Sequence, residues 1–180
     1  MLMNWLQCLF KQKKFTCEAA GIMFTNGTHV LAGYQPRKKK PHISGLGGGK
    51  QEGESYMQTA WRETLEELFE FKEIPKDLFD IIQLTIQPKD SFITGNYINV
   101  VYTFADLQQL LQLLHCYELE SNVYTIIPYN ITDLLFQRQH NKTAEISHLC
   151  LLPLVDHNWK NPFIDANFLK DIAALQEPKN

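Results

Sequence analysis

Apolar side chains recur along this chain at two intervals, and each interval predicts a different kind of element. Spacings of three and four residues predict amphipathic helices at residues 54–71, 106–114 and 163–175. Apolar and β-branched runs predict strands, the last of which could instead be a buried segment, at residues 15–24, 28–34, 80–87, 97–104, 123–127 and 148–155.

Turn sequences predict how these strands pair. Asn26-Gly27 is a strong two-residue turn signal, so the first two strands are expected to form a hairpin across it. Residues 88–95 are expected to be the turn of a second hairpin between the next two strands. Because helices and strands are mixed without a regular alternation, the chain is expected to be α+β, a sandwich around a mixed sheet.

The first ten residues place their large apolar side chains at helical spacing, at Leu2, Trp5, Leu6, Leu9 and Phe10. We expect a segment docked on the core, with a membrane-surface anchor as the alternative. The lysines of this region follow the apolar stretch, whereas those of a secretory signal precede it.

Composition narrows the class of protein. With 180 residues and 44% hydrophobic side chains, one domain with a substantial core is expected. The net charge of −3 provides no global positive field for DNA or an anionic membrane. No apolar stretch approaches the roughly 20 residues of a membrane span. The four cysteines form no CxxC pair, which favours buried thiols in a reducing, cytoplasmic compartment over a zinc site.

A basic loop precedes a glycine run in the first third of the chain. Arg37, Lys38, Lys39 and Lys40 could bind a polyphosphate, or they could belong to an ordinary solvated loop. The run that follows, residues 45–49, is expected to be flexible, and its backbone can approach a phosphate or a metal closely.

The predicted helix at residues 54–71 carries an acidic face. At about 100° per residue, its apolar side chains gather on one side, and Glu63, Glu66, Glu67 and Glu70 gather on the other. Like charges at this spacing repel, and Arg62 is expected on an adjacent face where it relieves nothing. A hard dication such as Mg²⁺ would relieve the repulsion, although a solvated acidic surface is the alternative.

The glycine run and this helix together resemble the Nudix box, G-x5-E-x7-R-E-U-x-E-E-x-G-U, where U is a bulky aliphatic residue. The matching residues, in register over residues 48–70, are Gly48, Glu54, Arg62, Glu63, Glu66 and Glu67. The flanking pattern of strands and loops agrees with this resemblance.

The sequence departs from that motif near its end. Thr64 and Glu70 stand where bulky aliphatic residues are usual, and Phe69 stands where the family has glycine. Leu46 replaces a proline that often precedes the glycines. Without that glycine, the helix is expected to continue for another turn.

The resemblance implies an α/β/α sandwich in which the box forms a loop–helix–loop. It implies Mg²⁺ or Mn²⁺ bound by Glu66, Glu67 and the Gly48 carbonyl, with Glu63 completing the cluster or acting as a base. It further implies that Arg62 and Glu54 pair to hold the helix in place.

Relatives often use one more acidic residue from a later loop, and Glu118, Glu120 and Glu145 are candidates. Glu120 is favoured as a metal ligand because it precedes a predicted strand.

The function implied is Mg²⁺-dependent hydrolysis of a phosphoanhydride bond by water attack on phosphorus. The candidate substrates are nucleoside diphosphate derivatives, dinucleoside polyphosphates, diphosphoinositol polyphosphates and capped RNA. A catalytically inactive Nudix-fold regulatory module is the alternative. Decapping would need stacking aromatics, for which Trp5, Tyr34, Tyr124 and Trp159 are available. Expected partners are a phosphorylated small molecule, an RNA cap or a second copy of the chain, and neither DNA nor a membrane.

Overall fold

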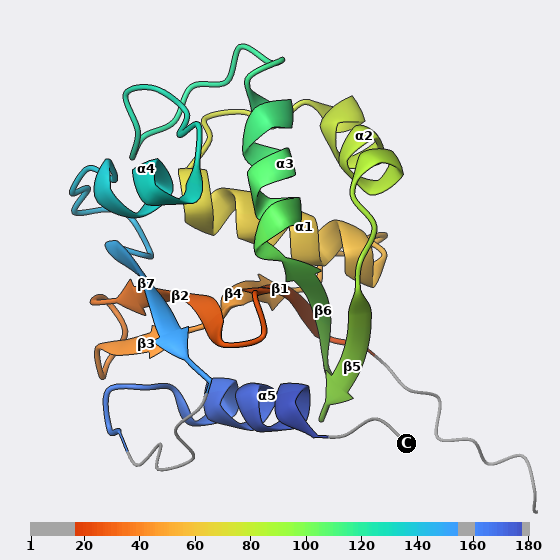
Figure 1. Cartoon of the computed structure of the whole chain (residues 1–180), viewed down its shortest axis with the longest axis vertical. Coiled ribbons are helices and arrows are strands. Elements are labelled where there is room, and N and C mark those ends of the chain that lie inside the picture. Colours follow the sequence, from red (N-terminus) through yellow and green to blue (C-terminus); the bar gives the residue numbers. More distant parts are fainter. Residues whose placement is uncertain (1–16, 155–160, 178–180) are drawn as a thin grey trace, which may run out of the picture.

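A seven-stranded mixed sheet forms the centre of the computed structural model, which describes residues 17–154 and 161–177 (Figure 1). Its strands are β1 (Ala19–Thr25), β2 (His29–Gln35), β3 (His42–Ser44), β4 (Leu46–Gly49), β5 (Asp90–Thr94), β6 (Tyr97–Thr103) and β7 (His148–Pro153). The order is β3-β2-β1-β6-β5, with β4 also paired to β1 and β7 to β2. The sheet is mixed because β1 and β6 run parallel, whereas the other pairings are antiparallel.

Helices cover both faces of this sheet. One face meets α1 (Tyr56–Phe69), α2 (Lys76–Thr85), α3 (Phe104–Leu114) and α4 (Ile131–Phe136), and the other meets α5 (Ala166–Gln176) (Figure 1). Successive side chains of a strand point to opposite faces, so Ile22 and Phe24 of β1 join the core under α1, and Met23 joins the core over α5. The predicted α+β sandwich is confirmed.

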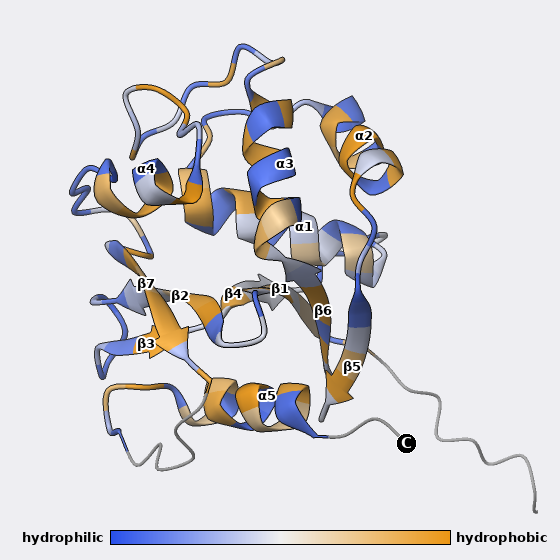
Figure 2. Ribbon diagram, viewed as in Figure 1, coloured by the Kyte–Doolittle hydropathy of each residue, from blue (hydrophilic) through white to orange (hydrophobic). Residues whose placement is uncertain are grey.

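Both faces of the sheet pack against helices, so its strands carry apolar side chains on both sides. β7 is apolar along most of its length (Figure 2). Its Leu149 contributes to the core under α1, whereas Leu152 packs into the core over α5. The strand is therefore sandwiched between helical layers, as its continuous apolar sequence requires.

Helix α1 begins with a capping box formed by Ser55 and Gln58. The Ser55 hydroxyl accepts a hydrogen bond from the Gln58 N–H at 3.2 Å, and the Gln58 side chain accepts one from the Ser55 N–H at 2.9 Å. The apolar face buries Ala60, Trp61 and Leu65 completely. This confirms the predicted helix and its core-facing side.

The expectation that α1 runs on for another turn is wrong. The helix ends at Phe69, and Glu70 adopts the left-handed conformation with φ 45°. Phe69 is fully buried and stacks on Phe71, with ring centroids 4.9 Å apart, and it also contacts Tyr124. Burying this ring fixes the exit of the chain and holds Glu70 in a conformation that usually favours glycine.

The last carbonyls of α1 find partners from distant segments instead of from a further helical turn. Arg138 donates to the Leu68 carbonyl and, at 3.0 Å, to the Glu67 carbonyl. The same guanidinium donates to the Ile146 carbonyl at 2.8 Å and lies 5.7 Å from the centre of the Tyr124 ring. Because helix ends leave carbonyls unpaired, these contacts stabilise the end of α1.

Several predicted elements are confirmed. The first hairpin forms across Asn26-Gly27, and the strands predicted at residues 97–104 and 148–155 appear as β6 and β7. The helices predicted at residues 106–114 and 163–175 appear as α3 and α5 with shifted starts.

Other predicted elements are wrong. Residues 80–87 belong mostly to α2, where Leu78 and Ile82 are buried four residues apart, and the buried Ile86 follows the helix as its C-cap. The second hairpin therefore joins β5 to β6. Residues 123–127 form no strand, and the glycine run belongs to β4.

Two further expectations concern the N-terminal segment and the cysteines. The predicted N-terminal helix lies outside the described residues. Cys116 is exposed, and Cys17 and Cys150 are half-buried, so the description of the thiols as buried is wrong for these three. Within residues 17–154 and 161–177, no helix has the length and apolar character needed to cross a membrane.

We expect Arg138→Ala to destabilise the protein by about 2–3 kcal/mol, because three buried carbonyls lose a charged donor. Urea unfolding should show a lower midpoint with an unchanged slope. Arg138→Lys is the matched control, and it should recover only part of the loss because an ammonium lacks the planar fork. A change below about 0.5 kcal/mol in the alanine variant, the range of ordinary surface substitutions, would contradict this role.

Candidate active site

The acidic face of α1 lines a pocket of about 330 Å³. Four carboxylates of the helix and its end line it together with residues of the surrounding loops: Glu63, Glu66, Glu67 and Glu70 with Arg37, Phe71, Asn122, Thr143 and Glu145. The four acids predicted to share one face therefore line one pocket. Their surroundings differ strongly, and these differences decide what each can do.

Glu67 is the buried member of the group, with only 6% of its surface exposed. One carboxylate oxygen accepts the Gly47 N–H at 2.7 Å, and the other accepts from the Gln35 amide at 3.3 Å. Burial raises the pKa of Glu67 well above its ordinary value, and the hydrogen bond from Gly47 opposes that shift. Burial without a cation in contact disfavours the ionised form of this acid, which is why its pKa rises.

The glycines of β4 let the backbone approach these acids. Gly47 has φ 142°, and a Cβ there would lie 2.4 Å from the Gly21 Cα. A Cβ on Gly48 would lie 2.4 Å from a carboxylate oxygen of Glu63. Position 47 therefore needs glycine, whereas a side chain at position 48 would have to displace the Glu63 carboxylate, which lies directly beside the Gly48 backbone.

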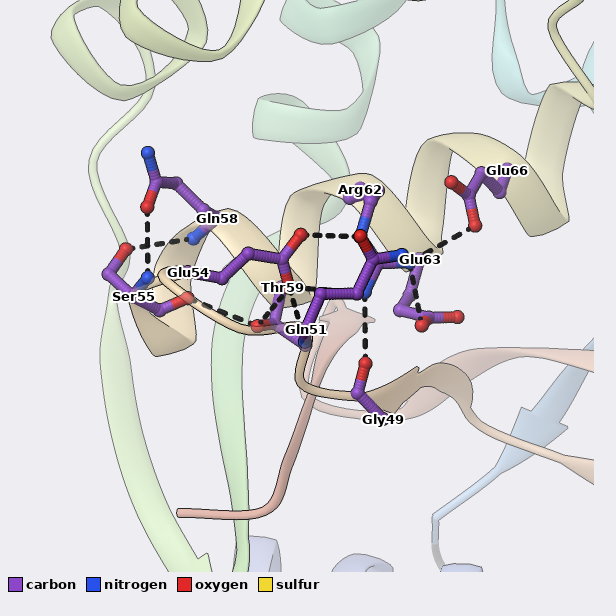
Figure 3. A network of polar contacts seen from close by, with 9 residues as sticks. All are labelled: Gly49, Gln51, Glu54, Ser55, Gln58, Thr59, Arg62, Glu63 and Glu66. Carbon is purple, nitrogen blue, oxygen red and sulfur yellow. Dashed lines mark hydrogen bonds and ion pairs between the residues drawn. The ribbon is translucent and has the colours of Figure 1, made fainter. Parts of the chain in front are cut away.

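Arg62 connects the loop before α1 to the acidic face (Figure 3). Its guanidinium donates to Glu54 at 2.6 Å, to Glu63 at 2.7 Å, to Glu66 at 3.2 Å and to the Gly49 carbonyl at 2.9 Å. The expectation that Arg62 relieves none of the repulsion is therefore wrong. An arginine side chain is long enough to reach back along the helix to the neighbouring face.

The pairing of Arg62 with Glu54 is the strongest ionic contact of the network. The hydrogen bond from Arg62 lowers the pKa of Glu54 to about 2, and the carboxylates in turn raise the pKa of Arg62. Both side chains are largely shielded from solvent, at 13% and 17% exposed. Glu54 also accepts from the Thr59 hydroxyl at 2.8 Å, which ties the loop to the first turns of α1.

The acids of this pocket are of the ligand type that a hard cation prefers, but they are not gathered around one point. In residues 17–154 and 161–177, no group of three His, Cys, Asp or Glu side chains is gathered closely enough to hold a metal ion. The Arg62 nitrogen that bridges Glu63 and Glu66 occupies the position of a positive charge between two carboxylates. Oxygen-only ligands suit Mg²⁺ or Mn²⁺, and Glu66, at 48% exposed, can turn towards an ion freely.

The basic loop reaches the pocket through only some of its residues. Arg37 lines it and donates to the Thr143 carbonyl, and Lys38 forms an ion pair with Glu145 at 2.6 Å. Lys39 and Lys40 are exposed and do not line it.

The three acids considered as an extra metal ligand from a later loop line two different pockets. Glu120 forms an ion pair with Lys72, and both line a different pocket together with Glu73 and Glu118. Of the three candidates, Glu145 lines the acidic pocket. Its proximity to α1 depends on long-range packing, and no local sequence pattern distinguishes it from the other two. Sequence reasoning also missed Gln35, the amide that contacts Glu67.

Tyr34 and Tyr124, the two aromatics considered for base stacking that the structure describes, do not line this pocket. Tyr124 is 3% exposed, and its hydroxyl donates to the Leu134 carbonyl at 2.6 Å, so it belongs to the core. Tyr34 is half-buried in β2. Trp5 and Trp159 lie outside the described residues.

No family model and no curated protein sequence matches the chain. Solved structures do align with it. A bifunctional NMN adenylyltransferase/ADP-ribose pyrophosphatase from Francisella tularensis, complexed with AMP and a manganese ion, aligns over 95% of this chain at 14% identity and a TM-score of 0.45. The alignment covers 43% of that protein, so this chain spans less than half of its length.

Two shorter proteins align over most of both chains. A Nudix hydrolase from M. smegmatis, RenU, aligns over 91% of this chain and 89% of its own, at 13% identity and a TM-score of 0.42. A MutT structure, from a study of the Aliivibrio salmonicida and Vibrio cholerae enzymes, aligns over 88% and 97% at 14% identity and a TM-score of 0.40. The structural neighbours across most of this chain thus include Nudix hydrolases, at identities and TM-scores that say nothing about its chemistry.

Proposed function

We propose that this chain is a single Nudix-like domain that hydrolyses a phosphoanhydride bond with the help of Mg²⁺ or Mn²⁺. The observation that supports this most directly is the buried Glu67 carboxylate, bound by the Gly47 N–H beside Glu63 and Glu66. A cation would stabilise the ionised form of this buried acid, and the motif register, Gly48 to Glu67, is that of the Nudix box.

In this proposal the acids of α1 hold the ion. Glu66, Glu67 and the Gly48 carbonyl would hold it, and Glu63 would complete the set once Arg62 releases its contact. Arg62 remains anchored by Glu54, so it can release Glu63 and Glu66 without leaving the network. When bound, the ion would neutralise phosphate oxygens and acidify the attacking water.

Other residues would bind the substrate and move the proton. Arg37, at the rim of the pocket, would contact a phosphate, and Lys38 could do so after leaving Glu145. Lys39 and Lys40 are proposed to add charge at longer range. Glu63 or Glu145 would accept the proton of the attacking water. Glu120 is not proposed as a ligand, because it is paired with Lys72 in another pocket.

The substrate proposed is a diphosphate that links a nucleoside or similar group to another moiety. The acidic pocket and the basic rim recognise the phosphates, which all such compounds share. A regulatory module without catalysis is the second candidate, because Arg62 already neutralises Glu63 and Glu66 without a metal.

Metal binding should be measured first, because it does not depend on knowing the substrate. At a Mg²⁺ or Mn²⁺ concentration 100 times the Kd, the folded state gains about 2.7 kcal/mol. For a chain of this size, the melting temperature should rise by roughly 5–10 °C. The triple variant Glu63→Gln, Glu66→Gln, Glu67→Gln should show no rise. A rise that survives in the triple variant would rule out these ligands.

Catalysis should be tested with a panel of dinucleoside polyphosphates, nucleotide sugars, deoxynucleotides, diphosphoinositols and capped RNA. We expect Glu67→Gln to lower the turnover of any substrate found by more than about 100-fold, since even outer-shell changes at metal sites cost about 10- to 100-fold. Exposed Glu73→Gln is the matched control. Metal binding without turnover of any panel member would favour the regulatory module.

The glycine requirement offers a subtler test. A Cβ on Gly48 must displace the mobile carboxylate of Glu63, whereas a Cβ on Gly49 meets no atom within 4 Å. Gly48→Ala should therefore weaken Mg²⁺ binding by about 10- to 100-fold with little loss of stability. Gly49→Ala should leave Mg²⁺ affinity nearly unchanged. Equal affinities for the two variants, measured by titration calorimetry, would be inconsistent with Glu63 in the metal cluster.

A further inference from the structure

Glu70 uses its carboxylate for a different purpose from the other acids of the pocket. One oxygen accepts the backbone N–H of Glu145 at 3.2 Å, and the other accepts the side-chain amide of Asn141 at 3.2 Å. Both oxygens are thus directed at the loop between α4 and β7. The side chain connects the end of α1 to a segment more than 70 positions later in the chain.

Asn141 organises that loop internally. Its side-chain oxygen accepts the N–H of Thr143 at 2.9 Å and the Thr143 hydroxyl at 2.8 Å, and its backbone carbonyl accepts the N–H of Ala144 at 3.2 Å. These contacts form a compact turn of the kind that asparagine favours. The bond from Asn141 to Glu70 therefore anchors a whole turn, and not a single side chain.

The backbone of Glu70 aims its carboxylate at this turn. Its φ of 45° makes it the one non-glycine residue with positive φ among the described residues. Its N–H donates to the backbone carbonyl of Glu66 at 2.8 Å, and its own carbonyl accepts the N–H of Asn122 at 3.2 Å. Glycine would take this conformation more easily, but it would supply no acceptor. Position 70 thus carries a carboxylate although its backbone conformation favours glycine.

The anchored loop delivers Glu145 to the acidic pocket. The neighbours of Glu145, Ala144 and Ile146, are buried at 1% and 0% exposed, so the chain is fixed on both sides. The Glu145 side chain, half exposed, lines the pocket and pairs with Lys38. Its negative charge also contributes to the raised pKa of Glu67, as expected for two acids facing the same space.

We propose that Glu70 is a positioning residue that holds Glu145 at the pocket, where Glu145 accepts the proton of the attacking water. The inference rests on the proposed function. The water oxygen bonds to phosphorus, the anhydride P–O bond breaks, the leaving phosphate departs with that electron pair, and the Glu145 carboxylate takes the proton. Glu70 contacts neither metal nor substrate, because both its oxygens are engaged by the loop.

The test compares Glu70→Gly, Glu70→Gln, Glu145→Gln and the double variant Glu70→Gly/Glu145→Gln, with Glu73→Gln as the control. Hydrogen exchange at the Glu145 amide should be faster in Glu70→Gly, and Glu70→Gln, which keeps one acceptor oxygen, should lie between it and the parent. Glu70→Gly should lower kcat by about 10- to 100-fold, the usual range for residues that orient a functional group. Mg²⁺ affinity and KM should change less than about threefold, since an interaction made only in the transition state affects kcat alone.

The double variant should be no slower than Glu145→Gln, because Glu70 acts through Glu145. Multiplying losses, or a tenfold loss of Mg²⁺ affinity in Glu70→Gly, would overturn the proposal and make Glu70 a ligand. Unchanged exchange at the Glu145 amide would overturn it as well. The exchange measurement needs no substrate, so an absence of turnover in the parent would count against the proposed function and leave this part of the test decisive.

Discussion

The hydrogen bond from the Gly47 N–H to Glu67 joins the sheet to the acidic helix, and much of the site depends on it. Glu67 is buried at the contact between β4 and α1, where an ionised carboxylate loses its hydration. One backbone donor and one amide offset that loss only in part. The protein therefore keeps an acid whose ionised form is poorly solvated at a fixed distance from a glycine backbone, and an oxygen-binding cation there would stabilise that form.

Arg62 offsets part of the repulsion among the carboxylates of α1 without a metal ion. Its guanidinium is fixed on one side by Glu54 and the Gly49 carbonyl, and on the other side it contacts Glu63 and Glu66. The ion pair between Arg62 and Glu54 is shielded from water, whereas Glu66 is half exposed. An exposed ion pair contributes little, so the contact with Glu66 is the easier one to give up. The same arginine can thus hold the helix in place and compete weakly with a metal.

Periodicity predicted the elements whose burial follows a simple pattern. The face of α1 that meets the core, the first hairpin, and strands β6 and β7 all follow from local spacing. It failed at residues 80–87, where β-branched residues suggested a strand but burial at Leu78, Ile82 and Ile86 has helical spacing. At the site, motif spacing identified the acids of α1. The position of Glu145 depends on contacts with residues far away in the chain, which local spacing does not encode.

The departures from the Nudix box show how tertiary contacts replace a local signal. The motif has a glycine at the end of the helix, where the backbone must turn. Here the turn is held by the buried ring of Phe69, by Arg138 on the last carbonyls and by the carboxylate of Glu70 on a distant loop. Each contact comes from a residue that local propensity would not select for a helix end. The exit of α1 is consequently tied to the loops that line the acidic pocket, so the end of the acidic helix and those loops depend on each other for their positions.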